Sequence, residues 1–327
     1  MLRNCILLAT VCLAALVSFV GCDSVQPINS TANNSDSTTP LPRSFSQTSN
    51  ADGWTVLIYM AADNDLEDDA ESIVSTLGQF DYSGGTLNVV AMVDSRSTAG
   101  TRVYQTDGGV DLVASDDGEK NTADPAVLEE FVQYGTSQFP SEKTMLIVKA
   151  PGYAWRGTCF DETNNDATMS IDGLAGALKG KGLDLLVFDA SYMGLLEVSY
   201  ELKDVASYMV ATQSTITDRG MPYEMLISYM LLNPEISPRD LAVDLVDGYT
   251  DYYYRDFSTI SACDLSKAGA VGEAFCRVTE VLEEWMRDNR NIIAPARDHS
   301  EIGLNNAVDQ SEYLHDLWVF FSDLEAI

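Results

Sequence analysis

Apolar and polar positions follow two patterns along the chain from residue 53 onward. Short apolar runs rich in β-branched and aromatic residues are typical of buried strands, whereas apolar residues three and four positions apart indicate helices. The first pattern predicts strands at residues 54–60, 86–93, 102–106, 144–149, 183–189 and 208–212. The second predicts intervening helices at residues 63–80, 124–139, 169–180 and 195–205. This alternation predicts an α/β fold with a mostly parallel sheet between two layers of helices.

Polar and proline residues mark two of the expected helix starts. The run Asp63-Asn64-Asp65 follows the first strand and is expected to cap the first helix, and Pro125 takes the first position of another. After Pro222 the pattern becomes helical, with helices expected at residues 223–232, 238–253, 264–289 and 312–324. We therefore expect one folded domain over residues 53–327 that is helical from about residue 223.

Residues 1–22 have the pattern of an export signal. Arg3 precedes an apolar run at residues 6–20, which is shorter than the roughly 20 residues of a membrane span. The run ends in Gly21 and Cys22, which resembles the lipobox of bacterial lipoproteins, where the cysteine is lipidated. We expect an exported protein that is anchored through Cys22 to a bacterial membrane, on its periplasmic or cell-surface face. Plain secretion and a retained signal anchor are the alternatives.

Residues 23–52 are rich in Ser, Thr, Asn and Pro and contain few bulky apolar residues. Such a segment buries too little surface to fold, and it is expected to be a flexible tether between the lipid and the domain.

The chain is strongly acidic, with 19 basic and 50 acidic residues and a formal net charge of −31. Binding of nucleic acid requires clustered Lys and Arg, so this composition argues against a nucleic-acid partner. It is compatible with charge that serves solubility or with partners that are basic peptides or proteins.

The cysteines do not form a disulfide framework. Cys5 and Cys12 lie in the signal, which leaves Cys159, Cys263 and Cys276 besides the expected lipid anchor. An odd number predicts buried free thiols, with a Cys263–Cys276 bridge as the alternative.

Candidate chemistry begins at residues 188–194, Phe-Asp-Ala-Ser-Tyr-Met-Gly, which follow an apolar strand and precede a helix. A small residue at the end of a parallel strand, just before such a turn, is where α/β hydrolytic enzymes present a nucleophile. Ser191 is the residue at this position.

Four segments, residues 54–67, 146–156, 185–202 and 212–223, resemble the clostripain family of cysteine peptidases. The resemblance implies a caspase-like α/β/α sandwich with a helical C-terminal part. In that family a cysteine at the end of one strand attacks the peptide carbonyl, and a histidine at the end of the neighbouring strand exchanges the proton. Matched residue by residue, the histidine position is Pro151 and the cysteine position is Ser191. The resemblance therefore predicts a pseudopeptidase that has lost both catalytic residues.

Other residues could supply a base. The two histidines, His299 and His315, lie in the expected helical part, away from any predicted strand end. Lys149 lies two residues before Pro151 on the same face of the strand and could form a dyad with Ser191, or it could pair with a carboxylate at the edge of the sheet. Cys159 has no imidazole nearby in the sequence and is expected to be inert.

The resemblance also implies a pocket for basic side chains. The family uses acidic residues to bind Arg or Lys before the scissile bond, and Asp189 and Asp218 lie at matching positions. Alternatively, Asp189 caps the turn after its strand. No cofactor or metal is expected, because the run from Asp161 to Asp166 lacks the spacing of an EF-hand and is interpreted as a solvated acidic loop.

Three functions remain open at this stage. The chain could be an inactive protein that binds basic peptides, a hydrolase of altered mechanism that uses Ser191, or a surface protein with a purely structural role. Its expected partners are the membrane, through the N-terminal lipid, and basic peptides.

Overall fold

The computed structural model describes residues 53–96, 101–106, 110–115, 119–217, 219–254, 259–299, 301–302, 314–315 and 317–325. The expected signal, tether and lipid anchor Cys22 lie outside these residues, as does Asp218. The chain divides into two compact units, one ending at Ser266 and the other beginning at Lys267. Among the described helices, none has the length and apolarity needed to cross a bilayer.

The first unit is built on a sheet with the strand order β10-β9-β8-β5-β1-β2-β3-β4 in the described part of the chain. Its strands are β1 (Trp54–Ala62), β2 (Leu87–Ser95), β3 (Arg102–Thr106), β4 (Val110–Ser115), β5 (Lys143–Lys149), β8 (Leu183–Asp189), β9 (Ala206–Thr212) and β10 (Ile260–Asp264). The strands from β9 to β2 are parallel, whereas β3, β4 and β10 each pair antiparallel with their neighbours, and β4 and β10 form the two edges. The predicted mostly parallel sheet is confirmed.

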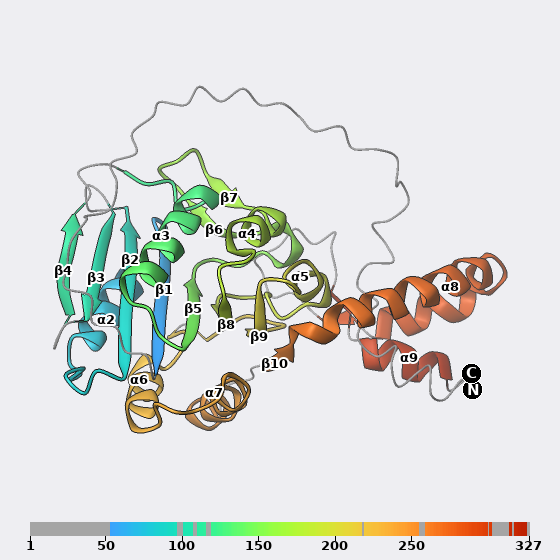
Figure 1. Cartoon of the computed structure of the whole chain (residues 1–327). Coiled ribbons are helices and arrows are strands. Elements are labelled where there is room, and N and C mark those ends of the chain that lie inside the picture. Colours follow the sequence, from blue (N-terminus) through green and yellow to red (C-terminus); the bar gives the residue numbers. More distant parts are fainter. Residues whose placement is uncertain are drawn as a thin grey trace. The chain divides into compact units, whose positions relative to one another are not determined.

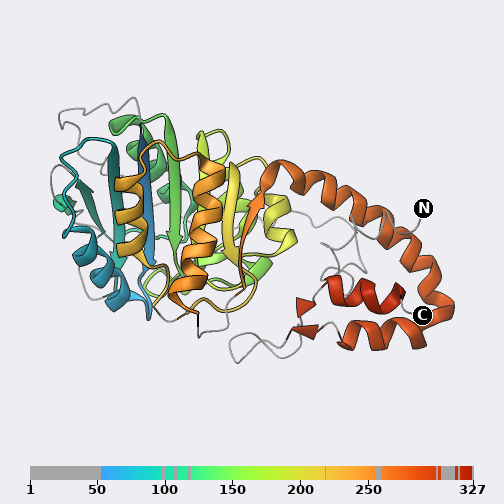
Figure 2. The ribbon, with the colours of Figure 1, turned by 90° about the horizontal axis from the view of Figure 1, so that it is seen from below.

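Helices cover both faces of this sheet (Figures 1 and 2). One layer holds α2 (Glu67–Leu77), α6 (Tyr223–Leu232) and α7 (Pro238–Tyr252), and the other holds α3 (Pro125–Gln138), α4 (Ile171–Leu178) and α5 (Leu196–Glu201). Successive side chains of β1 point to opposite faces of the sheet and pack against the two helix layers in turn. Val56 and Ile58 belong to the core beneath α2, α6 and α7, whereas Tyr59 packs against Phe131 of α3. The three-layer architecture follows from this alternation.

Of the two helix N-termini that the sequence pattern predicts, the structure confirms one and contradicts the other. Asp124 accepts a hydrogen bond from the Ala126 amide and precedes Pro125, as predicted for the start of α3. The expected cap of the first helix is wrong, because α2 begins only at Glu67 and its N-terminus has no side-chain cap. Asp63 is instead fully buried beside the end of β1, and its carboxylate is directed to other partners.

Several strands lie outside the predicted elements. These are β4, the hairpin of β6 (Thr158–Asp161) and β7 (Ala167–Met169), and β10. β10 interrupts the region that was expected to be helical from about residue 223, and it pairs antiparallel with β9. A short 3-10 turn, η2 (Ala154–Arg156), precedes the hairpin.

The second unit is a helical element with its own small core. The long helix α8 (Leu265–His299) leaves helical geometry at Asn289, which is where the predicted helix ends. It is followed by the short strands β11 (Glu301–Ile302) and β12 (Leu314–His315) and by α9 (Leu317–Glu325). Leu282, Ala296, Phe320 and Phe321 form the buried core of this unit.

Candidate functional site

The candidate site lies at the carboxyl ends of β5 and β8, which are side by side in the sheet. Lys149 and Asp189 are partners in the register of these parallel strands, and the Ala150 amide donates to the Asp189 carbonyl at 3.4 Å. The loops that leave the two strands therefore start next to each other. Parallel sheets place ligand and catalytic sites at this edge.

Ser191 lies in the tight turn after β8. Its Oγ accepts a hydrogen bond from the Ile216 amide at 3.1 Å. Tyr192, the next residue, has a positive φ of 62°, and its amide donates to the Ser214 carbonyl at 2.9 Å. A left-handed backbone is unfavourable for a tyrosine, so the surrounding structure holds this turn in place. The backbone therefore forms the tight turn expected after the strand, but the Ser191 hydroxyl at this turn is hydrogen-bonded to a backbone amide.

Pro151 begins the facing loop. The backbone of Gly152 approaches Ser191 so closely that a Cβ on Gly152 would lie 2.0 Å from the Ser191 carbonyl oxygen. The Pro151 carbonyl accepts from the Thr158 hydroxyl at 2.9 Å, which ties the loop to the β6–β7 hairpin. The structure therefore brings the positions of Pro151 and Ser191 together, and neither supplies an imidazole or a thiol.

Lys149 forms a buried ion pair with Asp189. Its Nζ lies 3.5 Å from Asp189 Oδ2 and 3.7 Å from an oxygen of Asp69, and its side chain is 3% exposed. The predicted alternative, that Lys149 pairs with a carboxylate at the sheet edge, is confirmed. Within the described residues, the hydrogen bond of the Ser191 hydroxyl is with a backbone amide, and the other alternative, a dyad with Lys149, has no hydrogen bond to support it.

Asp189 is an internal group with a full set of partners. Besides Lys149, it accepts hydrogen bonds from the Met221 amide at 3.1 Å and from the Tyr223 hydroxyl at 3.0 Å. Burial raises the pKa of the Asp189 carboxyl, and the neighbouring Lys149 opposes that rise. The second expected pocket residue, Asp218, lies outside the described residues.

Gly220 closes over this ion pair. It has a φ of +65°, and a Cβ there would lie 2.6 Å from Asp189 Oδ1 and 2.8 Å from Lys149 Nζ. Its carbonyl accepts from the Tyr253 hydroxyl at 3.0 Å. A glycine is needed here because any side chain would meet the charged groups beneath it and strain the backbone.

The thiols and imidazoles do not join the site. Cys159 is fully buried, and burial raises the pKa of its thiol to about 12, as expected for an inert group. The three described cysteines are free, but Cys276 is exposed, so the prediction that all of them are buried is wrong. His299 and His315 lie in the second unit.

A cluster of four carboxylates was not predicted. Asp63, Asp94, Glu119 and Asp161 each place an oxygen within 4.8 Å of the others. Asp161 is fully buried, so the interpretation of residues 161–166 as a solvated loop is wrong for its first residue. The available signal was an acidic residue at the end of each of two neighbouring strands, β1 and β2.

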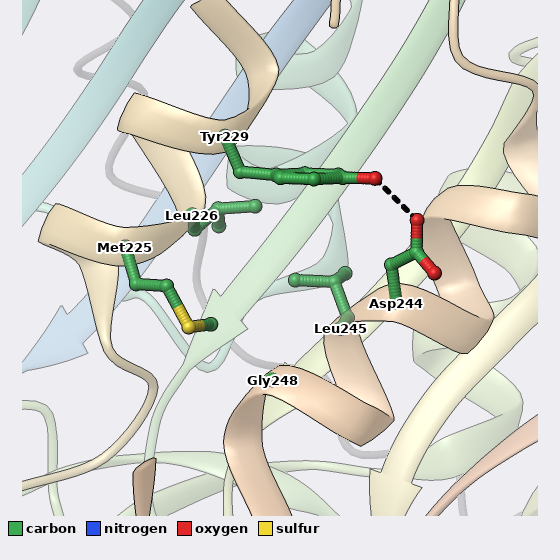
Figure 3. A pocket seen from close by; sticks show the side chains of 6 residues that line it. All are labelled: Met225, Leu226, Tyr229, Asp244, Leu245 and Gly248. Atoms are coloured by element: carbon green, nitrogen blue, oxygen red, sulfur yellow. Dashed lines mark hydrogen bonds between the residues drawn. The ribbon is translucent and has the colours of Figure 1, made fainter. Parts of the chain in front are cut away.

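A separate pocket of about 160 Å³ lies between α6 and α7 (Figure 3). It is lined by Met225, Leu226, Tyr229, Asp244, Leu245 and Gly248. The Tyr229 hydroxyl points to the Asp244 carboxylate and donates to it, so the polar groups of the lining satisfy each other. None of the strand-end residues lines this pocket.

The strand order and the helices on both faces of the sheet define a caspase-like α/β/α fold. The chain belongs to the clostripain family, whose family model matches residues 58–322. Clostripain from Hathewaya histolytica is 24% identical over 215 residues, and the match covers 53% of this chain and 41% of the relative. The chain thus matches about two fifths of that relative's length.

Two solved structures share the fold. A secreted cysteine protease from Bacteroides thetaiotaomicron, in complex with an irreversible peptide inhibitor, has a TM-score of 0.57 and 24% identity, with 67% of each chain covered. An inactive zymogen of a protease from Parabacteroides distasonis has a TM-score of 0.58 and 18% identity, covering 83% of this chain and 81% of that chain.

Proposed function

We propose that this protein is an exported, catalytically inactive member of the clostripain family, held at a bacterial membrane by a lipid on Cys22. The observation that carries the inactivity is the hydrogen bonding of Ser191. Its hydroxyl accepts from the Ile216 amide, and the loop that approaches it through Gly152 has Pro151 where the family has its histidine. A serine hydroxyl without an adjacent base is a weak nucleophile at neutral pH.

Lys149 does not restore the missing base. Its ammonium is held between Asp189 and Asp69. An ammonium ion has three donors and no lone pair with which to accept the proton of a serine. The buried lysine therefore acts as a structural cation in this proposal.

Binding of basic peptides is a second candidate function. It is favoured by the net charge of −31 and by the contact between Asp189 and a basic side chain of the chain itself. Because Lys149 occupies that carboxylate, a peptide must displace Lys149 or bind to another acidic residue, for which Asp218 is the second candidate from the sequence. A purely structural role is the outcome that remains if no peptide binds.

The inactivity is tested with residues 23–327 and a panel of Arg and Lys ester and peptide substrates. The expected turnover of the wild type equals that of Ser191→Ala and that of the uncatalysed reaction. Turnover that disappears in Ser191→Ala contradicts the proposal and establishes a hydrolase of altered mechanism.

Peptide binding is tested by calorimetry with short Arg-containing peptides. Lys149→Ala, measured under conditions in which circular dichroism shows it to be folded, is expected to increase the affinity by about tenfold or more, because it frees a charge-assisted hydrogen-bonding group. Asp189→Asn is expected to reverse that gain. If the heat signals are the same in all three proteins, or absent from all three, Asp189 does not bind basic side chains.

Export and lipidation are tested in cells grown with a labelled fatty acid. Wild type is expected to incorporate the label and to fractionate with membranes, and Cys22→Ser is expected to do neither. Equal labelling of both proteins contradicts the anchor at Cys22.

A further inference from the structure

The pocket of about 160 Å³ between α6 and α7 is formed by one face of each helix (Figure 3). Both helices contribute residues at positions i, i+1 and i+4, which lie on the same side of a helix. Its lining consists of Met225, Leu226 and Tyr229 from α6 and Asp244, Leu245 and Gly248 from α7. Leu226 and Leu245 are buried and belong to the core beneath these helices. The inner part of the pocket is therefore apolar and firmly packed.

Two contacts between the helices bound the pocket. At one end the Tyr229 hydroxyl donates a hydrogen bond to the Asp244 carboxylate. At the other end Met225 lies over Gly248, where a Cβ would be 2.8 Å from the terminal methyl carbon of Met225. Figure 3 shows the pocket between these two contacts. Methionine is unbranched and adapts to irregular spaces, so this end of the pocket can adjust to an occupant.

Water is a poor occupant of this pocket. A bound water needs about two to four polar partners, and an apolar cavity of about 150 Å³ is known to stay dry and to bind benzene. Here the two polar side chains of the lining, Tyr229 and Asp244, are already bonded to each other. The volume of about 160 Å³ therefore suits an apolar group of about the size of a phenyl ring.

The surface of α7 beside the pocket is acidic. Asp240, Asp247 and Asp251 are exposed, and together with Asp244 they follow at intervals of four, three and four residues, which places them along one side of the helix. Within α6, α7 and the loop between them, the one basic residue is Arg239, which pairs with Asp240. The other three carboxylates form no ion pair with a described lysine or arginine. This side of the protein therefore attracts a positively charged partner.

An exposed apolar side chain extends the pocket along α6. Leu232 is 81% exposed, and it follows Tyr229 by three residues and Met225 by seven, which places it on the same side of the helix. Apolar surface with a polar rim is typical of protein interaction sites. The pocket, the exposed leucine and the acidic helix thus favour a partner that is both apolar and basic.

We propose that the pocket between α6 and α7 binds a phenylalanine side chain of a basic peptide segment. The phenyl ring fills the apolar interior, and Lys or Arg residues beside it face the carboxylates of α7. The buried ring supplies most of the affinity, whereas the charges at the rim determine specificity and the rate of association. The site rests on the proposed binding of basic peptides, but it shares no residue with the pair of Lys149 and Asp189.

The test measures binding of the peptide Lys-Arg-Phe-Arg-Lys, blocked at both ends, to the purified protein by calorimetry. Exchange of the peptide's Phe for Ala is expected to weaken binding about tenfold to hundredfold, because a large apolar side chain is no longer buried. Exchange of its Lys and Arg residues for Gln is expected to weaken binding at least about threefold at low salt. Added salt is expected to weaken binding of the basic peptide.

A variant that fills the pocket provides the most specific test. Gly248→Leu places a side chain between the helices, and it is expected to weaken binding at least about tenfold, since the ring loses its space. The contact it makes first is with the flexible end of Met225, so α7 can accommodate it. Gly176→Leu in α4 is the matched control, because a Cβ there meets nothing within 4 Å, and it is expected to bind like wild type. Circular dichroism verifies that both variants are folded.

The contribution of the acidic side of α7 is tested separately. Asp247→Asn removes one exposed charge beside the pocket, and it is expected to slow association about twofold or more at low salt. Asp172→Asn makes the same change at an exposed position of α4, in the opposite helix layer, and it is expected to have no effect. Equal association rates in these two variants overturn the role assigned to α7.

The possible results distinguish this site from the strand-end site. Wild type that does not bind the peptide overturns the proposal, as does binding that persists in Gly248→Leu. Binding that responds to Lys149→Ala and not to Gly248→Leu assigns the peptide to Asp189, which overturns the pocket and leaves the proposed function intact. Binding of benzene without the peptide assigns the pocket to small apolar molecules instead. A dimer in sedimentation that Gly248→Leu dissociates assigns it to a second copy of the chain, and either result overturns the proposal.

Discussion

The ammonium of Lys149 lies 3.5 Å from the carboxylate of Asp189, and both groups are buried at the ends of adjacent parallel strands. The pair is completed by the Met221 amide and the Tyr223 hydroxyl. A basic side chain of the protein thus occupies the carboxylate that the family resemblance assigns to substrate binding. This buried ion pair lies at the same edge of the sheet as Pro151 and Ser191.

Lys149→Met is expected to destabilise the protein strongly. The change leaves the buried Asp189 without its cation, and loss of one partner of a buried ion pair costs about 3–5 kcal/mol. Lys181→Met is the matched control, because it breaks the partly exposed pair with Glu129 and is expected to cost at most about 1 kcal/mol. Urea denaturation measures both. Similar losses in the two variants contradict a buried structural pair.

Gly220→Ala is expected to cost more than Gly180→Ala. Both glycines have positive φ, +65° and +73°, so each alanine pays about 1–2 kcal/mol of backbone strain. A Cβ at Gly180 meets nothing within 4 Å, whereas a Cβ at Gly220 meets the charged atoms of Asp189 and Lys149. Overpacking adds about 1–3 kcal/mol at Gly220. Equal free energies of unfolding in the two variants contradict the close packing over the ion pair.

The stability of the protein is expected to fall as pH rises from about 4 to about 8. The folded Asp94 has a pKa of about 8, above its ordinary value of 3.8, under the influence of burial, Glu119, Asp161 and Asp63. Between these values the folded state binds more protons than the unfolded state, so raising the pH favours unfolding.

One such group contributes a slope of at most about 1.4 kcal/mol per pH unit. Urea denaturation at several pH values measures the slope in wild type and in Asp94→Asn. The variant is expected to have a less negative slope. Identical slopes contradict a raised pKa at Asp94.

The cysteines are expected to differ sharply in reactivity towards iodoacetamide. Cys276 is exposed, whereas Cys159 is fully buried with a thiol pKa raised to about 12. The thiolate is the reactive form, so native protein is expected to be alkylated at Cys276 within minutes and at Cys159 only after unfolding. Peptide mapping by mass spectrometry distinguishes the two sites. Rapid alkylation of Cys159 in native protein is incompatible with its burial.

Much of the fold could be predicted because the central strands are continuous apolar runs. Residues 54–60 are buried on both faces, as are residues 183–189 apart from the half-buried Asp184, and such segments are recognisable without knowing their neighbours. The β6–β7 hairpin and β10 could not be predicted in the same way. The hairpin strands are short, and β10, Ile-Ser-Ala-Cys-Asp, is a half-exposed edge strand with little apolar pattern.

The site was predictable where it depended on strand ends and not where it depended on distant loops. The adjacency of Pro151 and Ser191 follows from two motifs on neighbouring strands, and pairing of Lys149 with a carboxylate was one of two alternatives. The acidic cluster draws residues from positions 63 to 161, and only the folded chain brings them together. Asp63 even resembled a helix cap, because its sequence context is that of a capping residue.

The central claim, that Ser191 is not a working nucleophile, is tested most directly by covalent labelling. Purified protein is incubated with a fluorophosphonate, which reacts with activated serines, and the adduct is located by mass spectrometry beside an active serine hydrolase as the positive control. The account predicts no adduct at Ser191 under conditions that label the control completely. An adduct that maps to Ser191 and disappears in Ser191→Ala would contradict it.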